Sequence, residues 1–193
     1  MKRKKIIYFS ILIFLVISII SLTFLIVHKQ KSFKENGVLL GSPIENIKIS
    51  KEYNDSFVYE YATATHIQKM IELDASKTLD GKIVKLSTLI NNATFIVINV
   101  GTNDLTNYIN INSFKNTLSY DIEVLERQIS IIISSVSASI NSISTINNKC
   151  EIYLLNQQYP FAIYDETIDN LFNSLNESYE ILANKHNINN IKL

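Results

Sequence analysis

The strongest constraint on the fold is an apolar run from Thr94 to Val100 that ends at Gly101-Thr102-Asn103-Asp104. The run lacks polar alternation, which is the pattern of a strand buried on both faces of a parallel sheet. Because open α/β sheets bind ligands beyond the carboxyl ends of such strands, we expect Asn103 to lie at a site. Gly101 allows a close backbone approach to a ligand, and the Asn103 amide can donate to negative charge developing on an oxygen. The alternative is a turn that only ends the strand.

The segments around this run predict strands and helices in alternation. We expect strands at 37–40, 57–61, 152–155 and 188–193, and helices at 66–73, 83–90, within 113–146 and at 165–185. Segment 113–146 is apolar in its second half, but Glu123, Glu126 and Arg127 interrupt it, which favours a core-packing crossover helix over a membrane span. The alternation predicts an α/β protein with a three-layer, flavodoxin-like parallel sheet.

The amino terminus predicts a membrane anchor. Residues 6–27 form an apolar segment, long enough at about 1.5 Å per residue to cross a hydrocarbon core of about 30 Å. No small-residue cleavage site or lipid-accepting cysteine follows, so we expect an uncleaved signal anchor rather than a cleaved signal peptide. The basic residues of the tail 1–5 favour a cytoplasmic amino terminus, with the remaining chain outside the cytoplasm.

The predicted organisation is therefore a tail at 1–5, a transmembrane segment at 6–27, a linker at 28–36 and one α/β domain at 37–193. The lipid bilayer is the expected partner, through residues 6–27. The formal net charge is zero, which gives no electrostatic basis for binding nucleic acid. Cys150 is the only cysteine, so no intrachain disulfide is expected, and no metal or other cofactor is expected.

The sequence Gly101-Thr102-Asn103-Asp104 resembles the third conserved block, Gly-x-Asn-Asp, of the SGNH (GDSL-type) hydrolases. Residues 59–65 and the helix after them look like that family's second block. Residues 152–161 look like its next core strand and the following Tyr/Pro loop in lipase-like members. The resemblance covers the chain from Gly37 onward. It implies hydrolysis of acyl or acetyl esters by a serine nucleophile, a histidine base oriented by aspartate, and an oxyanion hole.

The sequence supplies these parts unevenly. The family's first block is Gly-Asp-Ser, and its closest match, Gly41-Ser42, lacks the aspartate. Ser42 is the candidate nucleophile, and the alternative is a Ser-Pro turn. The second block's oxyanion glycine falls at Thr65 or Ala64, whose main-chain N–H can still donate. Asn103, with Gly101 and Thr65, is the candidate oxyanion-binding set.

The fifth block, Asp-x-x-His, is absent. His28, His66 and His186 are the three histidines, and none has an aspartate three residues before it. His66 lies in the loop expected to face Asn103, so it is the candidate substitute base, and the alternative is a solvent-facing loop histidine. His186 follows the predicted helix at 165–185, where a polar or cationic residue is common. His28 falls at the membrane boundary.

Three functions stay open. The first is a membrane-anchored, extracytoplasmic SGNH-type esterase or lipase-like hydrolase that acts on acyl esters or acetylated glycans. The second is a catalytically impaired relative that keeps the fold as a binding or interaction module. The third is an anchor protein without a small-molecule site. Convergence of Ser42, His66 and Asn103 favours the first function, wide separation the second, and a flat surface around Asn103 the third.

Overall fold

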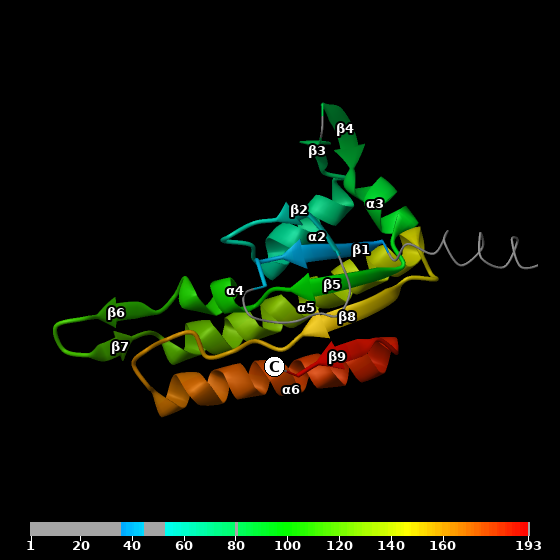
Figure 1. Cartoon of the computed structure of the whole chain (residues 1–193). Helices are drawn as coiled ribbons and strands as arrows, with labels where there is room; N and C mark the ends of the chain where they lie inside the picture. Colours follow the sequence, from blue (N-terminus) through cyan, green and yellow to red (C-terminus); the bar gives the residue numbers. More distant parts are fainter. Residues whose placement is uncertain (1–35, 45–52, 80, 193) are drawn as a thin grey trace, which may run out of the picture. The chain divides into compact units, whose positions relative to one another are not determined.

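The computed structural model describes residues 36–44, 53–79 and 81–192 (Figure 1). The chain divides into two compact units, residues 1–34 and 35–193, and every described residue belongs to the second. The predicted tail, the predicted anchor at 6–27 and residues 28–35 of the linker lie outside the described residues. Within the described part, α5 (Ile122–Ile146) is the one helix that is long and apolar enough to cross a membrane by length and composition.

The centre of the domain is a five-stranded sheet in which all neighbouring strands are parallel. Its order is β2-β1-β5-β8-β9, and the strands are β1 (Gly37–Gly41), β2 (Tyr53–Val58), β5 (Phe95–Asn99), β8 (Glu151–Leu155) and β9 (Asn189–Ile191). The parallel α/β sheet and the central place of the 94–100 run are therefore confirmed. The carboxyl ends of β1 and β5 coincide, because Gly41 lies opposite Asn99.

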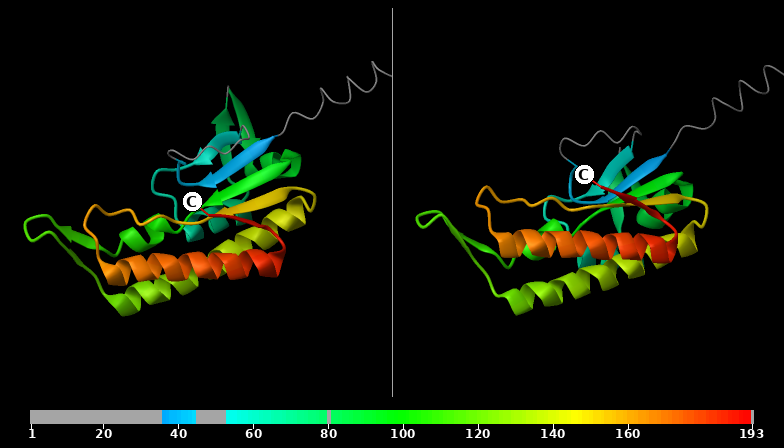
Figure 2. Two further views of the ribbon diagram at one scale, coloured as in Figure 1. Left: turned by 60° about the horizontal axis from the view of Figure 1, so that its bottom comes forward. Right: turned by 90° about the horizontal axis from the view of Figure 1, so that it is seen from below.

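The described helices pack on one face of this sheet (Figure 2). They are α2 (Ala64–Glu72), α3 (Leu86–Asn92), α4 (Thr102–Thr106), α5 and α6 (Glu166–His186). Side-chain oxygens of Thr63, Asp121 and Asp165 accept backbone N–H groups at the starts of α2, α5 and α6, as N-caps do. The predicted helices at 66–73 and 165–185 are present, and α5 buries one apolar stripe in the core.

The two faces of the sheet carry separate apolar clusters. Residues that alternate along the strands, such as Leu40 and Ile98, pack toward the helices. Their neighbours Leu39 and Val97 belong to a smaller cluster on the other face. Among the described elements no helix covers that second face, so the third layer of the predicted arrangement stays a prediction.

The predicted helix at 83–90 is wrong in its first half. Residues Ser76–Leu79 (β3) and Lys82–Lys85 (β4) form an antiparallel hairpin, and α3 begins only at Leu86. Gly81 adopts φ 76° at the turn, a conformation that favours glycine. The four residues of β4 are too few to distinguish period 2 from period 3.6.

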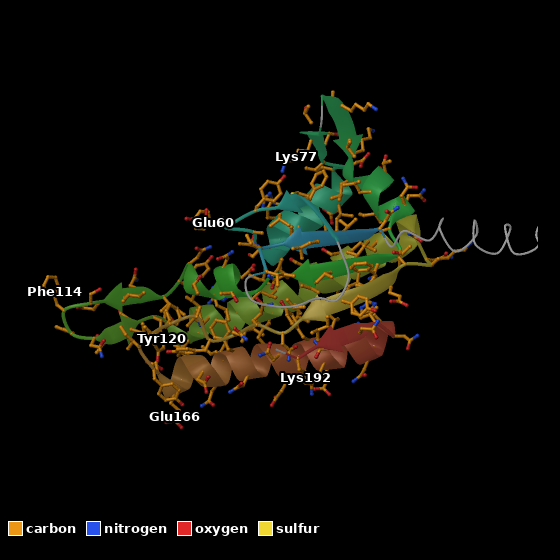
Figure 3. The ribbon with its side chains drawn as sticks, viewed as in Figure 1. Glu60, Lys77, Phe114, Tyr120, Glu166 and Lys192 are labelled. Atoms are coloured by element: carbon orange, nitrogen blue, oxygen red, sulfur yellow. The ribbon has the colours of Figure 1, made fainter. Side chains whose placement is uncertain are left out.

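Two other boundaries differ from the predictions. The strand expected at 57–61 spans Tyr53–Val58 instead, and its last bond to β1 runs from the Tyr59 N–H to the Gly41 carbonyl at 2.9 Å. The start of the 113–146 segment contains part of a hairpin of β6 (Asn110–Asn112) and β7 (Thr117–Ser119). Phe114 lies at its tip (Figure 3).

Gly41 ends β1 in a conformation and a space that only glycine fits. Its φ is 118°, and a Cβ there would overlap the Asn99 carbonyl group. This carbonyl accepts the Ser42 N–H at 2.8 Å, which holds it in place. The tight junction sets the position of Ser42 at the edge of the sheet.

We expect Gly41→Ala to lower the free energy of unfolding by at least about 3 kcal/mol, because backbone strain and a clash with a fixed backbone atom add. Gly81→Ala is the matched control: φ is also positive, but nothing lies within 4 Å of the added Cβ. We expect it to cost about 1 kcal/mol. Urea unfolding followed by circular dichroism measures both, and equal losses would contradict the role of the β1 junction.

Candidate functional site

Ser42 and Asn103 meet at the carboxyl edge of the sheet. Ser42 is the first residue after β1, and Asn103 lies in α4, which follows β5. The Asn103 Nδ2 donates to the Ser42 Oγ at 2.9 Å. The structure thus brings together two predicted site residues from distant parts of the chain.

The Asn103 amide is fully engaged. Its Nδ2 also donates to the carbonyl oxygens of Glu60 at 3.0 Å and Ala62 at 3.1 Å. An amide nitrogen carries two hydrogens, so three acceptors share them. The reversed amide would place Oδ1 against these oxygens, so the partners fix the orientation. The amide therefore ties the loop after β2 to the Ser42 junction, with carbonyl oxygens beside its donor.

The Ser42 hydroxyl has a hydrogen-bond donor beside it, but no histidine base in the part of the chain that the structure describes. Its oxygen accepts from Asn103, and its backbone N–H is engaged by Asn99. Among the described residues no histidine hydrogen-bonds to it. A serine hydroxyl without an adjacent base is a weak nucleophile at neutral pH.

The two candidate positions for the second block's glycine lie at the start of α2. The Ala64 N–H donates to both carboxylate oxygens of Asp104, at 3.0 and 3.1 Å. The Thr65 hydroxyl is 3.3 Å from the Ser135 hydroxyl of α5, so its side chain faces α5. Within the described ranges no hydrogen bond joins Thr65 to Ser42 or Asn103.

Gly101 is buried where β5 leads into α4. Its φ is 120°, and a Cβ there would lie 2.8 Å from the Tyr179 hydroxyl and 3.1 Å from Gln157. Tyr179 is fully buried and donates to the Val100 carbonyl at 2.8 Å. Glycine is therefore required for the close packing of α6 against this turn.

The described histidines stand apart from this pair. His66 is exposed, and its ring centroid is 5.2 Å from that of Tyr59. No hydrogen bond connects it to Ser42 or Asn103 in the part of the chain that the structure describes. His186 ends α6 and contacts Ser137 at 3.0 Å, at the amino edge of the sheet. His28 lies outside the described residues. The catalytic and oxyanion roles of the candidate residues stay predictions.

Sequence reasoning missed two amides that support the site. Asn99 donates from Nδ2 to the carbonyl oxygens of Ser42 at 3.1 Å and Pro43 at 3.2 Å. Buried Gln157 donates to the Asn99 Oδ1 at 3.3 Å and accepts from the Thr102 N–H at 3.1 Å. One side chain thus links the Ser42 junction to the start of α4. The sequence could have indicated these two residues only by their position, since both lie at the carboxyl ends of buried strands.

Asp104 is a buried carboxyl group in this region. It accepts from the Ala64 N–H, and the N–H groups of Gly101 and Asp104 itself also face it. Burial outweighs these bonds and raises the pKa of Asp104 to about 6. Among the described residues, no group of three or more His, Cys, Asp or Glu side chains is placed to hold a metal ion.

The raised pKa predicts a pH-dependent stability. Protonated Asp104 favours the folded state below the unfolded pKa, near 4, and this contribution is lost as the pH rises through about 6. We expect the free energy of unfolding of the wild type, relative to Asp104→Asn, to fall by about 2 kcal/mol between pH 4 and pH 8. Denaturant unfolding of both proteins across this range measures the difference. A difference that is constant or grows with pH would contradict the assignment.

Comparison with known proteins identifies the fold. No known family model matches the sequence, and no curated protein matches it. An extracellular lipase from Streptomyces rimosus is structurally similar, with 9% identity and a TM-score of 0.53 over 82% of this chain and 80% of the lipase. A mutant of the esterase AlinE4 matches with 11% identity and a TM-score of 0.49, over 82% of this chain and 75% of the esterase.

The likeness to the lipase confirms the resemblance in fold. The chain has an α/β fold with a five-stranded parallel sheet like that of the SGNH hydrolases. At this identity the likeness concerns the fold, and chemistry has to be argued from the site.

Proposed function

We propose that the chain is an SGNH-hydrolase-like protein, anchored in the cell membrane with its domain outside the cytoplasm, whose carboxyl-edge site is catalytically impaired. The domain keeps the hydrolase fold as a binding or interaction module. Its ligand class is an acyl ester or an acetylated glycan, as the resemblance implies. The fold of the Streptomyces lipase supports the hydrolase-like part of this proposal.

The observation that carries the proposal is the engagement of the Asn103 amide. An oxyanion donor must point to the position where negative charge develops. Here the donor faces the Ser42 hydroxyl and the carbonyl oxygens of Glu60 and Ala62. Carbonyl oxygens beside an oxyanion repel it, so this arrangement supports a structural role for Asn103.

The position of the first block supports the same conclusion. With Gly41 in the place of the glycine of Gly-Asp-Ser, Ser42 takes the place of the aspartate and Pro43 that of the serine. Proline has no nucleophilic side-chain atom. Ser42 then serves as a hydrogen-bond partner of Asn103 rather than as the attacking group.

Ester hydrolysis at Ser42 is the second candidate function. The 2.9 Å contact between Ser42 and Asn103, at the edge where α/β sheets bind ligands, favours it. The two functions differ in what removal of the Ser42 hydroxyl does to turnover.

We expect the full-length protein in detergent to hydrolyse p-nitrophenyl acetate and butyrate at a rate that Ser42→Ala changes by less than about twofold, because no histidine of the described ranges hydrogen-bonds to Ser42 to activate it. Asn103→Ala should instead lower the free energy of unfolding by about 1–3 kcal/mol, since it leaves carbonyl groups without their donor. Ser113→Ala, in the exposed hairpin, is the control. A loss of turnover of about 10²-fold or more in correctly folded Ser42→Ala and Asn103→Ala would establish the esterase instead.

The anchored topology rests on the apolar run at 6–27 and the basic tail before it. Protease added to intact cells should therefore digest the domain while a cytoplasmic marker survives. Immunoblotting against the domain measures the loss. Protection of the domain, or its release into the medium with a new amino terminus near residue 28, would refute the anchor.

A further inference from the structure

A serine and a histidine form a close pair on the helical layer, away from the carboxyl edge. The Ser137 hydroxyl of α5 lies 3.0 Å from the Nε2 of His186, the last residue of α6. Both side chains are partly buried. Because α6 ends just before β9 begins, the pair lies toward the amino edge of the sheet, opposite to Ser42.

The environment of His186 suits a base. Burial lowers the pKa of His186, and the positive charge of Lys185 lowers it further. The ring is therefore neutral at neutral pH. With its proton on Nδ1, the Nε2 accepts the hydrogen bond of the Ser137 hydroxyl. A nucleophile and a neutral base within hydrogen-bond reach are the first requirement of covalent acyl transfer.

A groove between α5 and α6 gives access to Ser137. Its volume is about 680 Å³, and its lining includes Ile129, Ile133, Ser137, Asn141, Leu182 and Lys185. The apolar side chains can cover a short acyl chain. Asn141 lies one turn beyond Ser137, and Asn141 and Lys185 are the N–H donors of the lining. The groove thus combines an apolar wall with polar groups around a hydroxyl.

We propose that Ser137 and His186 form an acyl-transfer site for esters of short apolar acyl groups. The Ser137 Oγ attacks the ester carbonyl carbon while its proton moves to the His186 Nε2. The bond to the leaving alcohol then breaks, and the alcohol takes this proton. Water, deprotonated by His186, attacks the acyl-serine, and the carboxylic acid leaves as Ser137 regains its proton. No other co-reactant is consumed.

The test is labelling of the full-length protein in detergent with a fluorophosphonate, which phosphonylates activated serines, followed by peptide mass spectrometry. We expect the label on Ser137. His186→Gln should slow labelling by about 10²-fold, because glutamine can keep a hydrogen bond to Ser137 but cannot take its proton. The control is Ser144→Ala, which replaces an exposed serine on the same helix. In this variant Ser137 should be labelled at the wild-type rate.

Absence of label at Ser137 in the wild type would overturn the proposal without any variant. An unchanged labelling rate in folded His186→Gln would also overturn it, because the contact would then only join two helices. Label on Ser42 would contradict the proposed impairment of the carboxyl-edge site. The presence or absence of label on Ser137 would still decide the present proposal. The two proposals therefore fail on different serines.

Discussion

The burial of β5 on both faces is the constraint on which the rest of the domain depends. Ile98 packs toward the helices and Val97 toward the other face, while β1 and β8 pair with the two edges of the strand. Every side chain of such a strand is buried, so polar functional side chains can lie only beyond its end. Its last residue, Asn99, already holds the Ser42 junction through its side chain and its carbonyl group. The site is thus built directly on the end of the core.

The polar groups at this edge satisfy one another. Gln157 is bonded to both Asn99 and Thr102, and Asn103 is bonded to Ser42 and two carbonyl groups. Buried polar groups need partners, because an unpaired one costs about 1–3 kcal/mol. A network that meets this need internally is rigid, but it leaves few free donors for a ligand. This internal pairing supports the proposed structural role of the carboxyl edge.

The sequence predicted the elements whose patterns are long or extreme. The apolar run of β5 and the helical periodicity of α6 were recognisable because burial selects their residues directly. Ser42 and Asn103 were each expected where a strand ends, and a parallel sheet places such ends at one edge, but their contact could not be predicted from the sequence. The hairpin of β3 and β4 was not predicted, because its strands are short and partly exposed.

Other features depend on backbone geometry that residue types do not encode. Asn103 donates to the main-chain carbonyl groups of Glu60 and Ala62. Every residue has such a group, so the side chains of Glu60 and Ala62 do not predict these hydrogen bonds. The pair of Ser137 and His186 joins two helices that are far apart in sequence. Its detection requires the relative rotation and stagger of α5 and α6, which helical periodicity does not fix.

Ser42 and Ser137 each have some of the features that the nucleophile of an active hydrolase needs. Ser42 lies at the carboxyl edge of the sheet and has an amide donor, but no histidine among the described residues hydrogen-bonds to it. Ser137 has a neutral histidine and an accessible groove, but lies on a helix away from the strand ends. Acyl transfer depends on a nucleophile, a base and access to the substrate, whichever element supplies them. A shared fold therefore determines where to look first, and local geometry determines which hydroxyl can react.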